Sequence, residues 1–372
     1  MDIRWLLIAM HETKGMGRKG INRIIADGLL TEHIIDGDAG WWGTLGYSVE
    51  LSERLARNLS RENLSVQQRE KELDPLVQTL TILDQDYPAL LKESPDPPLV
   101  LYTRGDTGLL HQPGIAMVGT RMPTAYGRKM GEELAQGLVI SGFVIVSGLA
   151  RGIDSVCHEA ALSGGGGTIA VMATGMDMIY PPENRALFAR IANEGLILTE
   201  YPRGTKPHPG LFPQRNRIIA GLTLGTLVVE ADERSGSLIT ADAALDADRE
   251  VFAVPGQVTS PKSRGALNLI RQGAKMICEA SDIIEEFDSW LPNRLKNTYN
   301  KERQVKEGSL NGEGHLTTDE LQLYHILEQG PLTLDELLQQ SRWDFGHLHS
   351  VLLSLIIKKQ ITQLPGAIYK TI

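Results

Sequence analysis

The sequence predicts a doubly wound α/β fold, in which helices cover both faces of a mainly parallel sheet. Seven short apolar runs between residues 114 and 278 alternate with helical patterns, as in βαβ units. These runs are apolar without interruption, which is typical of parallel strands buried on both faces. With 372 residues and 42% hydrophobic content, the chain is long enough for this sheet and for two smaller domains.

The expected elements follow one another in order along the sheet domain, which we place at residues 66–290. Strands are predicted at 114–119, 143–148, 168–173, 196–200, 226–231, 250–256 and 274–278. Helices are predicted to begin near Tyr126, Ile153, Glu183, Gln214, Ser237 and Ala266. One earlier short strand is expected at 99–102, inside a proline-rich stretch. The order of strands and helices is that of an extended Rossmann-like sheet.

Two smaller domains are predicted to flank the sheet. Residues 1–65 have helical periodicity around a glycine-bearing turn, and the glycine spacing is like that of a helix-hairpin-helix or SAM-like module, although an ordinary turn between helices is favoured. Residues 291–315 lose apolar periodicity and indicate a solvated linker. Residues 316–372 predict three helices and a hairpin, a winged-helix-like unit whose third helix is not strongly basic.

Composition limits the class of function. The net charge of −9 and the pI near 5.6 exclude a protein that coats nucleic acid by overall charge, so an anion site must be local. Apolar runs are too short for a membrane span, which favours a cytoplasmic protein without a membrane partner. Cys157 and Cys278 form no C-x-x-C pair, and the nine histidines have no ligand spacing. No metal or cofactor is therefore expected.

Candidate anion-binding residues follow the predicted strands, because ligands of open α/β sheets bind beyond the carboxyl ends of the strands. Glycine allows a backbone to approach a ligand closely, and a helix start offers free N–H groups to phosphate oxygens. The first three turns of interest supply Gly119, Thr120 and Arg121, then Ser147, Gly148, Arg151 and Gly152, and finally Ser235, Gly236 and Ser237.

A fourth group, formed by Phe212, Arg215, Asn216 and Arg217, surrounds a predicted helix start. Pro213 favours the first helical turn, so the two arginines would lie where the helix dipole disfavours cations. A bound phosphate between the arginines of these turns would explain that placement. The alternative is structural pairing, of Arg217 with Glu200 or Glu230 and of Arg151 with Asp154. Phe212 is the leading candidate for base stacking, and a buried role beneath its loop is an equal alternative.

Motifs of known phosphate enzymes are absent from the sequence. It contains no G-x-x-x-x-G-K-[ST] loop, its first strand is not followed by G-x-G-x-x-G, and it has no G-x-S-x-G elbow. The sequence therefore indicates a protein that binds its ligand without converting it.

Five motifs in order resemble the DprA/Smf family of DNA-processing proteins. They are "AMVGTRMPTAYG", "VSGLARGID", "MATGMDMIYPPENRALF", "FPQRNRIIAGL" and "VVEADERSGSLITADAALDADREVFAVPG". The resemblance is strong from about Leu80 to Phe287 and extends more weakly to the two flanking domains.

This resemblance implies a non-enzymatic protein that binds single-stranded DNA, protects it, and helps load a RecA-type recombinase during natural transformation, usually as a homodimer. The positions that match the family's DNA-contacting motifs are 119–121, 148–152, 212 and 215–217, whereas 235–237 match its phosphate-contacting loop less closely. The alternative is a nucleotide-binding or phosphoribohydrolase-like enzyme on a related sheet, with Glu200 or Glu230 as acid or base. The P-G-G-x-G-T-x-x-E pattern of those enzymes is absent.

Overall fold

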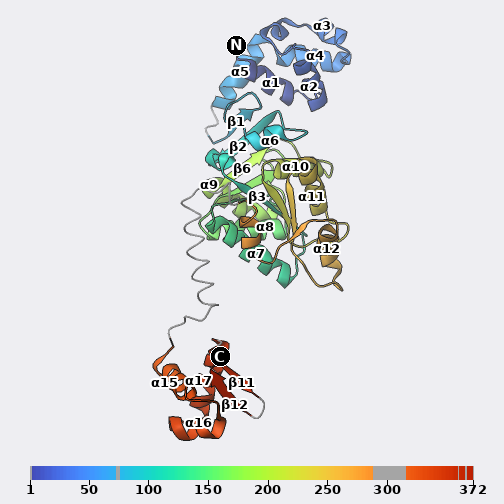
Figure 1. The fold of residues 1–372 in the computed structure, drawn as a ribbon. Helices are drawn as coiled ribbons and strands as arrows, with labels where there is room; N and C mark the ends of the chain where they lie inside the picture. The colour runs from blue at the N-terminus through green and yellow to red at the C-terminus, as the bar shows by residue number, and fades with distance from the viewer. Residues whose placement is uncertain (1, 73–75, 288–315, 359, 365–366, 372) are drawn as a thin grey trace. The chain divides into compact units, whose positions relative to one another are not determined.

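The computed structural model describes residues 2–72, 76–287, 316–358, 360–364 and 367–371 (Figure 1). The chain divides into two units, Met1–Leu291 and Pro292–Ile372, which are described separately. None of the helices in the described ranges is long and apolar enough to cross a membrane.

A nine-stranded sheet forms the centre of the first unit, in the order β1-β2-β6-β5-β4-β3-β7-β8-β9. Its strands are β1 (Gln78–Thr81), β2 (Val100–Gly105), β3 (Gly114–Val118), β4 (Val144–Ser147), β5 (Thr168–Met172), β6 (Leu196–Thr199), β7 (Gly225–Val228), β8 (Glu250–Ala253) and β9 (Lys275–Met276). Strands β3 to β9 are parallel, whereas β1 and β2 extend the sheet in antiparallel orientation beyond β6. The doubly wound, mainly parallel fold is confirmed.

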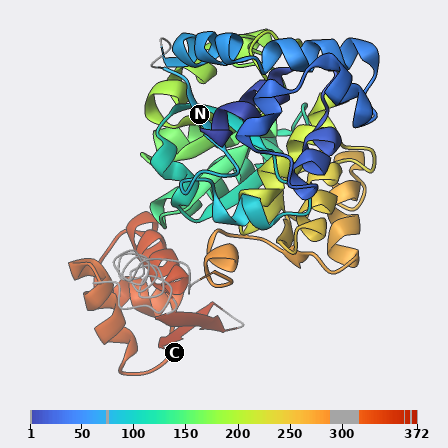
Figure 2. The same cartoon turned by 90° about the horizontal axis from the view of Figure 1, so that it is seen from above.

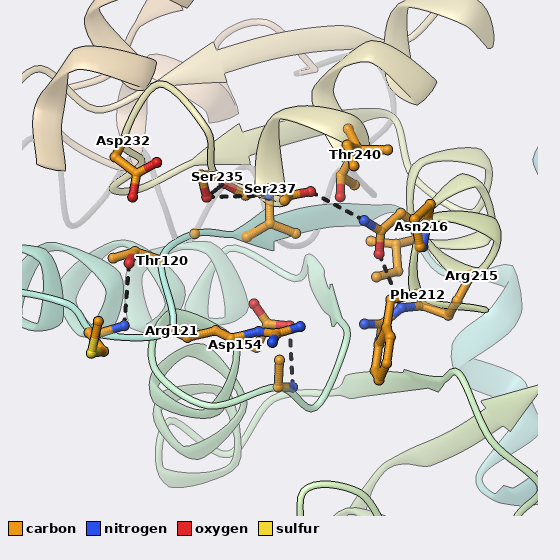
Figure 3. Close-up of a pocket in the computed structure, with 18 residues that line it drawn as sticks. Thr120, Arg121, Asp154, Phe212, Arg215, Asn216, Asp232, Ser235, Ser237 and Thr240 are labelled. Carbon is orange, nitrogen blue, oxygen red and sulfur yellow. Dashed lines mark hydrogen bonds between the residues drawn. The ribbon is translucent and has the colours of Figure 1, made fainter. Parts of the chain in front are cut away.

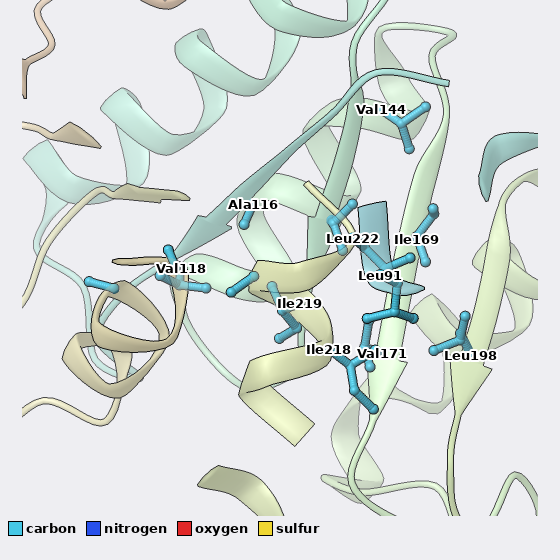
Figure 4. Close-up of a cluster of buried hydrophobic side chains, with 14 of the residues drawn as sticks. Leu91, Ala116, Val118, Val144, Ile169, Val171, Leu198, Ile218, Ile219 and Leu222 are labelled. Carbon is cyan, nitrogen blue, oxygen red and sulfur yellow. The ribbon is translucent and has the colours of Figure 1, made fainter. Parts of the chain in front are cut away.

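Helices cover both faces of this sheet. Those between the strands are α6 (Ala89–Glu93), α7 (Ala125–Ile140), α8 (Ile153–Ser163), α9 (Arg185–Glu194), α10 (Leu211–Gly221), α11 (Ser237–Asp246) and α12 (Arg264–Arg271), with 3-10 turns at Thr107–His111, Pro182–Asn184 and Pro261–Ser263. Helix α13 (Ser281–Ile284) follows β9. Ile218 and Ile219 of α10 pack on the face that carries Val171 (Figure 4). The preceding residue of β5, Ala170, faces the opposite way and packs with Phe188 of α9. This alternation is the period of two that a strand imposes.

The strand order reverses at β3, which lies between β4 and β7. Ala116 is paired with Val146 of β4 on one side and with Thr226 of β7 on the other. The chain builds the sheet in one direction through β4, β5 and β6, and then crosses over to β7. Such a switch point opens a crevice at the carboxyl ends of the strands, where α/β proteins bind ligands.

Helix α10 begins earlier than the sequence suggested. It starts at Leu211 rather than near Gln214, so Arg215 and Arg217 lie beyond its first turn. Pro213 is tolerated inside this start because the first four N–H groups of a helix have no partner within the helix. The helix-dipole argument for an anion between these two arginines was therefore wrong.

The N-terminal head consists of helices α1 (Ile3–Glu12), α2 (Arg18–Ala26), α3 (Ala39–Thr44), α4 (Val49–Asn58) and α5 (Arg61–Glu72), with a 3-10 turn at Glu32–Asp36. Trp42 and Leu55 lie in its core, which also takes in Val100 of β2. Gly15 has φ of +95°, a conformation that favours glycine in the turn between α1 and α2. Figure 1 shows the head beside β1 and β2, and Figure 2 shows the same blue helices from above.

The second unit has the winged-helix arrangement. It contains α15 (Thr318–Leu327), β10 (Leu332–Thr333), α16 (Leu334–Ser341), α17 (Phe345–Ile357), β11 (Ile361–Leu364) and β12 (Ile368–Thr371). Thr317 with Glu320, and Thr333 with Glu336, form capping boxes that fix the starts of α15 and α16. The predicted three helices and hairpin are present, and β10 adds a third strand. The domain boundaries at residues 65, 290 and 315 stay predictions, and the predicted linker, 291–315, lies outside the described residues.

Candidate functional site

A pocket of about 430 Å³ opens at the switch point of the sheet (Figure 3). It lies beyond the carboxyl ends of β3, β4 and β7, and α10 closes one side. Nine of the predicted site residues line it: Gly119, Thr120, Arg121, Phe212, Arg215, Asn216, Ser235, Gly236 and Ser237. The crevice expected from strand order is therefore a real cavity, and most of the predicted residues meet there.

The turn after β3 places an exposed cation at the mouth of this pocket. The guanidinium carbon of Arg121 lies 5.6 Å from the centre of the Phe212 ring, a distance at which a cation interacts with an aromatic face. A Cβ on Gly119 would lie 2.6 Å from Cγ1 of Ile153, so only glycine fits where the turn crosses α8. Arg121 is thus held near Phe212 and remains accessible to an anion.

The turn after β4 is held together by a buried carboxylate. Asp154 accepts hydrogen bonds from the backbone N–H groups of Gly148 (3.1 Å) and Ala150 (3.3 Å). Burial raises the pKa of Asp154, and the charge of Arg215 opposes that rise. Gly152 has φ of +80°, and a Cβ there would lie 2.3 Å from the carbonyl oxygen of Thr120. These contacts fix the β4 turn against the β3 turn.

Arg215 lies beneath the pocket with only 4% of its surface exposed. Its Nη1 donates to the carbonyl oxygens of Gly148 and Val171, each at 2.5 Å, at the ends of β4 and β5. Burial lowers the pKa of Arg215 to about 10, so the side chain is still charged at neutral pH. The guanidinium joins two strand ends and brings positive charge to the pocket floor.

The start of α11 forms the wall next to α10. The hydroxyls of Ser235 and Ser237 are 2.7 Å apart, and a Cβ on Gly236 would meet no atom within 4 Å. Asn216 donates from Nδ2 to the carbonyl oxygen of Gly236 at 3.4 Å. The amide therefore joins α10 to the start of α11 at the edge of the pocket.

Five predicted residues lie outside the main pocket. Gly148 and Arg151 line a smaller crevice that also contains Arg121 and Phe212. Ser147 is buried and donates to the carbonyl oxygen of Met117 at 2.6 Å, so its hydroxyl belongs to the sheet. The remaining two residues are Gly152, in the turn described above, and Arg217.

Arg217 forms the structural pair that the sequence left open. Its Nη2 donates to the carboxylate of Glu200, and its Nη1 donates to the carbonyl oxygen of Asp96 at 2.5 Å. The side chains of Arg217 and Glu200 are only 16% and 7% exposed. Arg18 of the head joins this cluster through Asp96 and lies 3.6 Å from Glu200.

Replacing Arg217 with alanine is expected to lower the free energy of unfolding by ~2 kcal/mol, because the buried carboxylate of Glu200 would lose its nearer cation. Arg18 remains as a second cation, which keeps the loss below that of a wholly unpaired carboxylate. Thermal unfolding of the variant measures the effect. An unchanged midpoint of thermal unfolding would show that the ion pair does not stabilise the fold.

The structure also adds pocket residues that the sequence interpretation missed. Asp232, Ile239 and Thr240 line the pocket from the β7 side. Asp232 directly follows the apolar run that ends β7, so the rule used for the other turns could have found it. Ile239 and Thr240 face the pocket from within α11, and no local motif marks them.

The fold and pocket define a Rossmann-like α/β protein that carries a binding pocket at the switch point of its sheet, with a winged-helix unit following in the chain. A family model described as DNA recombination-mediator protein A matches residues 78–288, and one described as the DprA winged helix domain matches residues 312–367. The chain belongs to the DprA/Smf family, as the five motifs predicted.

Relatives and solved structures agree with this assignment. Protein Smf of Synechocystis is 40% identical over 319 residues, which are 79% of this chain and 80% of that protein. The X-ray structure of DNA processing protein A from Streptococcus pneumoniae matches with a TM-score of 0.67 and 37% identity, over 77% of this chain and 99% of that one. A structure of DNA processing protein A from Helicobacter pylori, solved to describe its single-stranded DNA binding mode, matches with a TM-score of 0.53 and 34% identity. The match covers 58% of this chain and 97% of that one.

Proposed function

We propose that this protein binds single-stranded DNA at the switch-point pocket, without catalysing a reaction on it. The observation that carries the proposal is the exposed guanidinium of Arg121 over Phe212 at the pocket mouth. A cation beside an aromatic ring suits a phosphate and its neighbouring base, which is how sequence-tolerant single-strand binders work. The single-strand binding of the Helicobacter pylori relative supports the same ligand.

The proposed contacts divide among the predicted residues. Arg121 holds a phosphate, the residues at 235–237 line the α11 side of the pocket, and Asn216 and Phe212 line the path of the strand. Arg215 lies beneath the pocket and does not contact the strand directly. It fixes the turn after β4 and contributes positive charge to the pocket. Arg217, by contrast, braces α10 and is left out of the proposed contacts.

The enzymatic alternative would use Glu230 or Glu200 as its acid or base. Glu230 accepts hydrogen bonds from the backbone N–H (2.8 Å) and the hydroxyl (2.7 Å) of Thr124 at the start of α7. Glu200 is paired with Arg217. Both glutamates therefore have structural partners, which favours binding without turnover.

Membership of the family supports a proposal for the finer biological role. We propose that the protein protects incoming single strands, helps load a RecA-type recombinase on them in natural transformation, and works as a cytoplasmic homodimer. Faster growth of recombinase filaments on protein-coated single strands in its presence tests the loading role. Light scattering of the purified protein tests the dimer.

The ligand is tested by equilibrium binding of oligo-dT, of the same length of duplex DNA, and of nucleoside monophosphates. We expect oligo-dT to bind most tightly, because a flexible strand can follow the pocket and its aromatic rim. Incubation with monophosphates is expected to release no free base. Release of base that Glu230→Gln abolishes would contradict the proposal.

A further inference from the structure

A row of three side chains leads out of the switch-point pocket. Arg121 lies 5.6 Å from the ring centre of Phe212, and the ring centre of Tyr180 lies 5.7 Å from the same ring on a tilt of 52°. Arg121 and Phe212 line both the pocket and the smaller crevice, whereas Tyr180 lines only the crevice. The row therefore joins the two hollows, with Tyr180 at its outer end.

The segment that carries Tyr180 is fixed to the β4 turn. Asn184 donates from Nδ2 to the carbonyl oxygen of Leu149 at 2.8 Å and to the hydroxyl of Ser155 at 2.9 Å. One residue earlier, Glu183 pairs with Arg151 at 2.5 Å. The segment that follows Tyr180 is thus held by bonds that do not involve its ring.

Within the described residues, the ring contact of Tyr180 is the tilted one with Phe212. Tyr180 is 38% exposed, and within the described residues its hydroxyl makes no hydrogen bond. Tyr180 is thus an exposed aromatic side chain on a fixed segment, next to the proposed phosphate site. This position favours a contact with the bound strand.

We propose that Tyr180 is a stacking platform for a nucleobase of the bound strand, next to the nucleotide whose phosphate lies at Arg121. This inference rests on the proposed single-strand binding. Phe212 is flanked by Arg121 and Tyr180, which leaves less of its ring free, whereas Tyr180 ends the row. Any base can stack on an aromatic face, so the platform takes the strand without regard to sequence.

The crevice itself does not hold the base. Its volume of about 20 Å³ has room for roughly one water molecule. The base therefore lies on the open face of Tyr180, outside the crevice, and the strand passes along the rim.

Arg151 continues the path beyond Tyr180. Its side chain is 51% exposed and that of its partner Glu183 is 59% exposed. Exposed ion pairs of this kind contribute little to stability, so Arg151 can exchange Glu183 for a phosphate at small cost, while the hydrogen bonds of Asn184 keep the segment fixed. The strand thus runs from Arg121 over Phe212 and Tyr180 toward Arg151.

The test compares two ligands of equal length, oligo-dT and a strand of abasic sugar phosphates. Tyr180→Ala is expected to weaken oligo-dT binding about tenfold, equal to ~1.4 kcal/mol, and to leave binding of the abasic strand unchanged. Tyr180→Phe, which keeps the ring, is expected to bind as the natural protein does. Tyr126→Ala is the matched control, because Tyr126 is 46% exposed on α7 and lines neither hollow.

The outcomes distinguish failure of the Tyr180 proposal from failure of the proposed single-strand binding. Equal weakening for both strands would overturn the platform, because the lost contact would then not be with a base. No weakening for either strand would overturn it as well, while oligo-dT binding by the natural protein would leave the proposed function standing. Failure of the natural protein to bind oligo-dT would overturn both.

Discussion

Replacing Arg215 with methionine is expected to lower the free energy of unfolding by ~3 kcal/mol. Methionine keeps most of the length of the side chain but removes the donors to the carbonyl oxygens of Gly148 and Val171. A buried acceptor that loses its partner costs roughly 1–3 kcal/mol, and two are affected here. Asp154 would also lose the positive charge that stabilises its ionised form. Denaturant unfolding measures the change.

Arg121→Met is the control for this experiment, because it removes a guanidinium that is exposed and bonded to no strand end. We expect its unfolding midpoint to stay at the natural value. If Arg215→Met unfolded at the same denaturant concentration as Arg121→Met, the buried guanidinium would not be holding the strand ends together. Arg215 would then be free to act as a direct ligand of DNA.

Replacing Arg121 with alanine is expected to weaken oligo-dT binding about thirtyfold, since a hydrogen bond to a charged partner contributes ~1.5–3 kcal/mol. The loss of one phosphate contact also makes binding less sensitive to salt. The slope of log affinity against log salt should become shallower by about 0.7. Titrations of labelled oligo-dT at several salt concentrations measure both quantities.

Arg128→Ala is the matched control for Arg121→Ala. Arg128 is an exposed arginine in the first turns of α7, seven residues further along the chain, and does not line the pocket. Its removal changes the net charge equally, so any general effect of charge appears in both variants. Equal affinities of the two variants would remove Arg121 from the binding site.

The parallel strands of the sheet could be predicted from the sequence, and so could the end of the strands at which the pocket lies. Parallel strands buried on both faces have a strong apolar signal, and the turns after β3 and β7 follow from where those strands end. The short strand β1 (Gln78–Thr81) was missed because it has neither a long apolar run nor burial along its length.

The partners of individual side chains were harder to predict, because they come from distant parts of the chain. Arg217 is paired through Asp96, which lies more than a hundred residues earlier. Gly148 was expected to let a ligand approach, yet the atom nearest to a Cβ there would be Nη1 of Arg215, at 2.2 Å. A glycine motif indicates that another group comes close to the backbone, but it does not distinguish a ligand from a side chain of the protein.

The cluster formed by Arg18, Asp96, Glu200 and Arg217 has a consequence for how this sequence can diverge. Its four members come from the head, the segment before β2, the end of β6 and α10. A change of charge at one position leaves an imbalance that only another member can correct. Among relatives that keep the same head, we expect these four positions to vary as a set, whereas Arg121, which lines the pocket, is expected to vary independently of them.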